Sequence, residues 1–191
     1  MSLTEEQLKQ TLPGRVQHFA NTRGTRPALR HKQLGVWQEI TWNDYAHNVA
    51  TTARMLWQLG VRPGDHVAIL SDNRPEWLYA DLGAQAIGAR SVGIYQTSPA
   101  PDVSYIVNHS ESKVLFCEDQ EQVDKLMEIT GETPKLEHVV AIEPRGTRGY
   151  DESRLMEWDD FFSKGEELLA AEPGWFEQRL GDLAPQAASM V

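Results

Sequence analysis

Three sets of side chains in this 191-residue chain have types that could take part in catalysis or metal binding. The first is His109, Ser110 and Glu111, which are the residue types of a hydrolase triad. Neighbours in sequence at the end of a helix point in different directions, so these three cannot form a proton relay. We expect His109 and Ser110 to end a helix instead.

The other two sets are a lone cysteine and an acidic run. Cys117 ends an apolar segment and has no evident activating cation, so we expect a small buried hydrophobe rather than a nucleophile. Glu157, Asp159 and Asp160 could bind a divalent cation, but carboxylates are also stabilised in the first turn of a helix. We expect a solvated helix start there, and we assign no catalytic residue and no metal ligand to this chain.

Sequence motifs for phosphate binding are missing. Neither GxGxxG nor GxxxxGK followed by Ser or Thr occurs, and GxSxG, HExxH and EF-hand patterns are also absent. The six histidines do not have the spacing of zinc ligands. The sequence therefore has no recognisable catalytic constellation of its own.

Two loops fit a ligand-binding role by their position. Ser71 and Asn73 follow one predicted strand, and residues 95–98 follow the next. Ligands of open parallel sheets gather at the carboxyl ends of the strands, where helix amino termini also point. We expect Ser71, Asn73 and Trp77 to line a pocket. The alternative is helix capping and turn formation by the loops, and core packing by Trp77.

The elements that must position these loops follow from hydrophobic periodicity. Apolar residues recur every three or four positions from Trp42 to Leu59, which predicts an amphipathic helix. Thr41 and Asp44 resemble a capping box, and Gly60 suits the left-handed residue that ends a helix.

Short apolar runs predict four strands at residues 66–71, 91–95, 113–117 and 138–142. Their spacing suits right-handed crossovers through helices. We expect Asn73 to cap the first of these helices, which should end at Gly88, Ser98 with Pro99 to open the second, and residues 119–130 to form the third. The predicted fold class is α/β, with a mostly parallel sheet flanked by helices.

The remaining segments are expected to be simpler. Residues 143–157 read as an exposed connection, residues 158–171 as a helix, and residues 187–191 as an apolar ending. A chain of this length suits one domain, burying roughly 70% of its unfolded surface. We expect residues 1–11 to be a tail or an expression remnant, and residues 12–191 to form a single α/β subdomain.

Composition excludes several functions. The net charge is −10, from 18 basic and 28 acidic residues, so a nucleic-acid backbone would be repelled on average. No stretch approaches 18 uninterrupted apolar residues, and no secretory signal begins the chain, so no transmembrane segment is expected. A single cysteine suits a reducing compartment, and we expect the cytoplasm.

Several sequence segments resemble motifs of one enzyme family. In order along the chain they are residues 40–45, 60–77, 85–95 and 105–116, and together they resemble the amino-terminal region of AMP-forming acyl-CoA synthetases. Asn73-Arg-Pro-Glu-Trp77 with Ile94-Tyr-Gln-Thr-Ser98 is most similar to the long-chain fatty-acid ligases. The resemblance implies the amino-terminal subdomain of the acyl-CoA synthetase fold, truncated.

The resemblance also implies a reaction for the whole enzyme. Such enzymes activate a fatty acid with ATP and Mg²⁺ to an acyl-adenylate and then transfer the acyl group to CoA. The family's phosphate-binding loop, its Tyr-Gly-x-Thr-Glu word, its ribose-binding Asp and its mobile-domain Lys have no counterpart here, and residues 182–191 resemble the approach to that loop. We therefore expect this segment to be inactive alone and to bind no cofactor tightly. Tyr95, Gln96 and Thr97 are expected to approach the CoA side of the whole site.

Three further expectations follow. The alternative function is a free-standing, non-catalytic α/β module that binds a ligand or a partner. A truncated sheet leaves unpaired edge groups and apolar surface, which predicts homo-oligomers through an exposed sheet edge. The whole enzyme could also be peripheral to a membrane.

Overall fold

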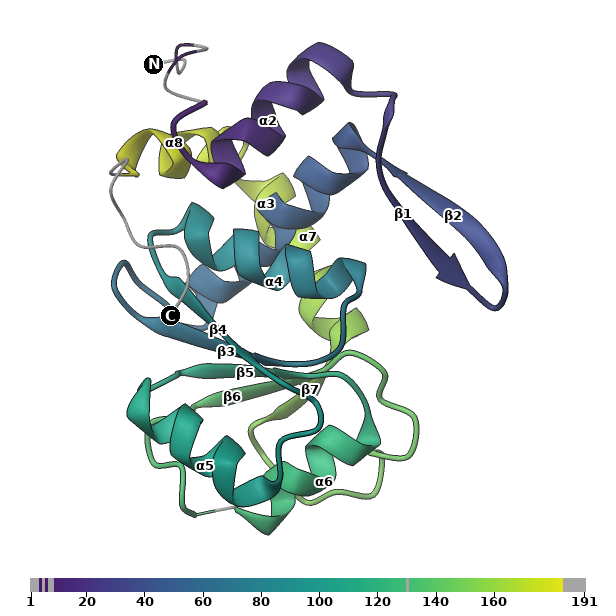
Figure 1. The fold of residues 1–191 in the computed structure, drawn as a ribbon. Coiled ribbons are helices and arrows are strands. Elements are labelled where there is room, and N and C mark those ends of the chain that lie inside the picture. Colours follow the sequence, from purple (N-terminus) through teal and green to yellow (C-terminus); the bar gives the residue numbers. More distant parts are fainter. Residues whose placement is uncertain (1–3, 5, 7–8, 130, 184–191) are drawn as a thin grey trace.

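Five parallel strands form the central sheet of the computed structural model, which describes residues 4, 6, 9–129 and 131–183. The spatial order is β4-β3-β5-β6-β7, and a separate antiparallel hairpin pairs β1 with β2 (Figure 1). The strands are β1 Pro27–Gln33, β2 Val36–Thr41, β3 His66–Leu70, β4 Arg90–Ile94, β5 Val114–Cys117, β6 His138–Ala141 and β7 Leu155–Glu157.

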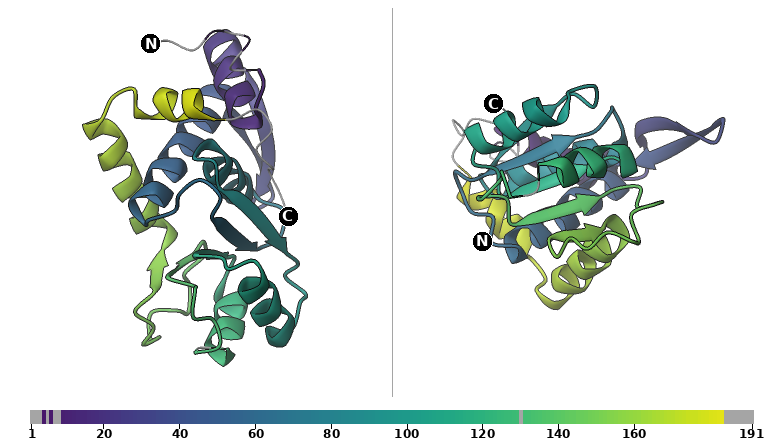
Figure 2. Two further views of the ribbon diagram at one scale, coloured as in Figure 1. Left: turned by 90° about the vertical axis from the view of Figure 1, so that its left-hand side faces the viewer. Right: turned by 90° about the horizontal axis from the view of Figure 1, so that it is seen from below.

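Seven helices surround these strands within the described residues. Helices α5 and α6 cover one face of the sheet, and α4 and α7 cover the other, with α3 packed outside them and α2 and α8 beyond (Figures 1 and 2). Their bounds are α2 Leu12–Arg23, α3 Trp42–Gln58, α4 Pro75–Ala86, α5 Ala100–His109, α6 Gln120–Glu128, α7 Trp158–Ala171 and α8 Trp175–Asp182.

The apolar runs form central strands because both faces of the sheet are covered. Ile69 and Phe116 point into the core shared with α3, α4 and α7, whereas Leu70 and Leu115 point into the core shared with α5 and α6. All four side chains are fully buried. The prediction of an α/β fold with a parallel sheet is thereby confirmed.

Helix α3 follows its sequence signals closely. Thr41 Oγ1 accepts from the Asp44 amide at 3.2 Å, and Asp44 Oδ2 accepts from the Thr41 amide at 3.0 Å. Gly60 has the left-handed φ of +86° that follows a helix end. The bounds predicted for the helix at residues 158–171 also match the structure.

One predicted cap was wrong, and the start of a second helix lies one residue later than Ser98. Arg74, rather than Asn73, is the N-cap of α4, because the residue before Pro75 is restricted to extended backbone, and Arg74 has φ −148° and ψ 164°. Pro99, rather than Ser98, is the N-cap of α5. Neither helix has a side-chain cap hydrogen bond.

The predicted exposed connection at residues 143–157 was wrong in its last part, because residues 155–157 form β7 beside β6. Three half-buried residues are too short to give a periodic signal. The β1 strand and the helices α2 and α8 were not predicted. Residues 187–191 and Thr130 lie outside the described residues, as do most of residues 1–8, so the boundaries 1–11 and 12–191 stay predictions.

Candidate functional site at the carboxyl edge of the sheet

The loops that follow the four longer sheet strands meet at one edge. Leu70 lies opposite Ile94 in one neighbouring strand and opposite Cys117 in the other, and Cys117 lies opposite Ala141. The strands run parallel and end at the same level, so the loops beginning at residues 71, 95, 118 and 142 leave the sheet together.

A cavity of about 320 Å³ lies between the loops after β3 and β4. The structure places five of the six residues singled out from the sequence around it, namely Ser71, Asn73, Trp77, Tyr95 and Gln96. Asp72, Gly93 and Ile94 complete the lining, and Thr97 does not contribute to it. What these residues bind stays a prediction.

The Trp77 ring is the main wall of this cavity. It lies so close to β4 that a Cβ added to Gly93 would be 3.4 Å from Trp77 Cζ2. The indole therefore packs on β4 at a distance that leaves just enough room for a Cβ at position 93, and the ring lines one side of the cavity.

Trp77 and Asn73 also line a second cavity of about 280 Å³. Its other walls come from the start of α4 and from β1, including Leu29 and His31. This cavity could not be expected from the sequence, because the strand that forms its outer wall was not predicted.

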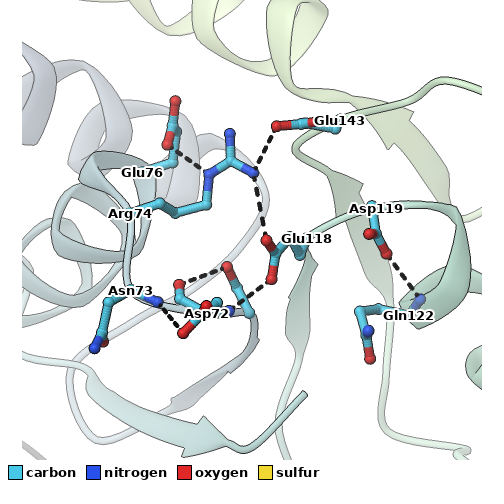
Figure 3. A network of polar contacts seen from close by, with 9 residues as sticks. Asp72, Asn73, Arg74, Glu76, Glu118, Asp119, Gln122 and Glu143 are labelled. Atoms are coloured by element: carbon cyan, nitrogen blue, oxygen red, sulfur yellow. Dashed lines mark hydrogen bonds and ion pairs between the residues drawn. The ribbon is translucent and has the colours of Figure 1, made fainter. Parts of the chain in front are cut away.

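An ion-pair network ties the loops together on the other side of the edge (Figure 3). Arg74 Nε lies 2.7 Å from Glu76 Oε2, and Arg74 Nη1 lies 3.1 Å from Glu143 Oε1 and 4.0 Å from Glu118 Oε1. Glu118 also accepts a 2.6 Å hydrogen bond from the Asp72 amide. The loops after β3, β5 and β6 are therefore fixed relative to one another.

The network sets the charge around Arg74. Burial would lower the pKa of Arg74, but the hydrogen bond and charge of Glu76 and the charge of Glu143 outweigh it and raise that pKa above its ordinary value. Three carboxylates face one guanidinium, so the cation is already engaged and the local charge is negative.

Lys125, on α6, contacts the Tyr95–Thr97 loop. Its ammonium donates to the carbonyl oxygen of Gln96 and, at 3.0 Å, to Gln122 Oε1, and it pairs with Glu121 at 3.2 Å. Sequence reasoning missed this residue. The only available signal was the Glu121–Lys125 spacing of four, which is also found in many exposed helices.

The candidates for catalysis occupy other positions. His109 ends α5 and stacks on Tyr105 with ring centroids 5.6 Å apart, while Ser110 Oγ donates to the Ile106 carbonyl at 2.8 Å. Burial raises the pKa of the Cys117 thiol well above its usual range, and the charge of Asp119 adds to this. Neither arrangement activates a nucleophile.

Asp159 and Asp160 lie exposed in the first turn of α7, with Glu157 as its N-cap. Within the described part of the chain, no three His, Cys, Asp or Glu side chains gather closely enough to hold a metal ion. A search of the same residues finds no helix with the length and apolarity needed to cross a bilayer.

Comparison with known proteins gives a consistent match. Residues 16–174 match the family model described as AMP-binding enzyme. A long-chain-fatty-acid–CoA ligase of Mycobacterium bovis is 37% identical over 117 residues, which are 61% of this chain and 20% of that protein. The chain thus spans about a fifth of the length of the ligase it matches.

Two further matches differ in kind. An uncharacterized protein of Mycobacterium tuberculosis is 39% identical over 106 residues, which are 56% of this chain and 58% of that protein. The structure of acetoacetyl-CoA synthetase from Streptomyces lividans superposes with a TM-score of 0.68 at 26% identity, covering 82% of this chain and 25% of that one.

Proposed function

The chain belongs to the family of AMP-binding enzymes, and we propose that it is the amino-terminal part of a long-chain fatty-acid–CoA ligase. In the whole enzyme a fatty acid would be activated by ATP to an acyl-adenylate and transferred to CoA. The observation that carries the proposal is the family match across residues 16–174 together with the cavity formed by Trp77, Tyr95 and Gln96.

This segment supplies walls rather than reactive groups. In this proposal Mg²⁺ and the phosphates of ATP are bound by other parts of the enzyme, and Arg74 stays engaged by its three carboxylates. The Trp77 cavity suits an uncharged, extended group such as the pantetheine arm of CoA. Trp77, Tyr95 and Gln96 would hold that arm, while the phosphates would lie on other parts of the enzyme.

The first test addresses inactivity of the segment alone. With ATP, Mg²⁺ and palmitate, the 191-residue chain should release no pyrophosphate above a blank without protein. The Mycobacterium bovis ligase is the positive control under the same conditions. Turnover by the isolated chain would overturn this part of the proposal.

The second test addresses the CoA assignment. The chain replaces the matching region of the Mycobacterium bovis ligase, and the two half-reactions are measured separately. Removing the indole with Trp77→Ala should raise KM for CoA about tenfold, since a large buried apolar contact is lost. Pyrophosphate release should be unchanged, because the adenylating groups lie elsewhere. The matched control is Tyr105→Ala, at an exposed aromatic of α5.

An equal loss in both half-reactions would show that Trp77 supports the fold rather than CoA. No change in either would remove Trp77 from the site.

The second candidate function is a free-standing binding module. It is favoured by the uncharacterized relative, in which 106 matched residues make up 58% of the protein rather than a fifth. A chimaera that folds and yet makes no acyl-CoA would favour this alternative.

Self-association and cytoplasmic localisation stay proposals. Among the described residues β4 is the outermost strand of the sheet, and a second copy could pair with it. Light scattering at micromolar concentration should then give a mass above that of one chain, 21.6 kDa.

A further inference from the structure

The hairpin of β1 and β2 projects from the body of the molecule (Figures 1 and 2). At its root, Leu29 and Ile40 pack against the main core. At its tip, Leu34, Val36 and Trp37 are 99%, 59% and 65% exposed. These three residues are half of the large hydrophobic residues exposed in the described part of the chain, and we refer to them as the hairpin tip.

The backbone makes leucine an unexpected residue at the tip. Leu34 has φ +48° and Gly35 has φ +83°, the two left-handed positions of a two-residue hairpin turn. Asn-Gly or Asp-Gly suits such a turn, whereas a leucine there is strained. Because the Leu34 side chain is almost fully exposed, no packing within the chain offsets the strain. An exposed apolar side chain on strained backbone is a reason to look for a contact outside the chain.

The charge around the tip is opposite in sign to that of the whole molecule. The outer part of the hairpin, residues 30–39, contains two basic side chains that are always charged, Arg30 and Lys32, and one acid, Glu39, in a chain of net charge −10. Arg30 pairs with Glu39 at 2.6 Å. Lys32 lies directly across the hairpin from Trp37, and none of the described residues forms an ion pair with it.

The hairpin is long enough for the charge at its tip to act independently of the acidic body of the molecule. A seven-residue strand extends about 23 Å, more than twice the Debye length of about 8–10 Å in physiological salt. The acidic body is therefore largely screened from a surface that the tip touches.

We propose that the hairpin tip inserts into the interface of a lipid bilayer that carries anionic headgroups. Leu34 and Val36 enter the acyl boundary, and Trp37 lies at the headgroup level, where its amphipathic ring is favoured. Lys32 contacts the lipid phosphates. This surface is separate from the Trp77 cavity.

A second copy of the chain fits the tip less well. In a two-fold pair the same patch meets itself, so two surfaces of like charge would face each other. Three side chains also offer far less than the approximately 800 Å² per partner of a stable protein interface.

The test is flotation of the full 191-residue chain with vesicles of neutral phosphatidylcholine or of a 70:30 mixture with phosphatidylglycerol, at about 0.1 M salt. The chain should bind the mixed vesicles and bind the neutral ones more weakly. Trp37→Gln should weaken binding about tenfold through lost apolar contact, and Lys32→Gln about fivefold through lost charge. Tyr105→Gln, at another exposed aromatic, should bind as the unmodified chain does.

Three outcomes would overturn the proposal. One is absence of binding to the mixed vesicles, and another is equal binding by the hairpin variants, whose folding circular dichroism verifies. The third is a dimer in light scattering that Trp37→Gln dissociates, which would assign the tip to pairing between copies.

Discussion

The central sheet and the β1–β2 hairpin use strands in opposite environments. Every residue of β5 is buried, whereas none of the residues described in β1 and β2 is. In the sheet, an apolar side chain is accounted for by its neighbours in the same chain. At the hairpin tip there are no such neighbours, so the same kind of side chain has to be explained by something outside the molecule. Burial thus separates residues that specify the fold from residues available for contact.

The largest effect expected from this contrast is the loss of a core aromatic. Phe116 is fully buried in β5 and packs edge-on against Phe161 with ring centroids 5.4 Å apart. Phe116→Ala should lower the free energy of unfolding by about 3–5 kcal/mol, since it leaves a cavity under α7. Urea denaturation followed by circular dichroism measures the change.

The matched hairpin variant is Val36→Ala, which should change the free energy of unfolding by less than about 0.5 kcal/mol because Val36 is largely exposed. Similar losses for the two variants would show that the hairpin is part of the folding core, and the contrast would fail.

A smaller effect is expected from alkaline pH. Burial raises the pKa of Tyr79 to about 12 from an ordinary value of 10.0. The neutral phenol is favoured in the folded state, so its stabilising contribution is complete below pH 10 and is lost as pH rises toward 12. Thermal unfolding should show a loss of roughly 1–3 kcal/mol across this interval.

Tyr79→Phe should reduce this alkaline loss, whereas Tyr95→Phe, at an 85% exposed position, should leave it unchanged. A pH dependence that is the same in all three proteins would exclude Tyr79 as its source.

Local signals were sufficient to predict the strands and most helices. The run from His66 to Leu70 is continuously apolar after its first residue, and Thr41 with Asp44 marks a helix start without any knowledge of the fold. Strand β7 was missed because three half-buried residues depend on β6 for their conformation. The hairpin strand β1 was missed because its exposed residues carry no burial pattern.

The candidate site was predictable by position but not by contact. Ser71, Asn73 and Tyr95 follow strands, and the rule for parallel sheets brings such residues to one edge. The Arg74 network required the order of the strands, because Glu118 and Glu143 come from loops after β5 and β6. Sequence spacing does not encode that adjacency.

A small effect of opposite sign discriminates best between the two regions. Leu34→Asn places a residue suited to left-handed backbone in the hairpin turn, so it should stabilise the fold by about 0.5–1 kcal/mol. The same change removes an apolar side chain from the tip, so binding to anionic vesicles should weaken. Thermal unfolding and vesicle flotation of the same preparation measure both effects. If Leu34 served the fold, Leu34→Asn would lower both the stability of the protein and its binding to vesicles. If Leu34 serves an external contact, Leu34→Asn should raise the stability and lower the binding. Reduced stability in Leu34→Asn would therefore refute the view that the fold itself disfavours leucine at this position.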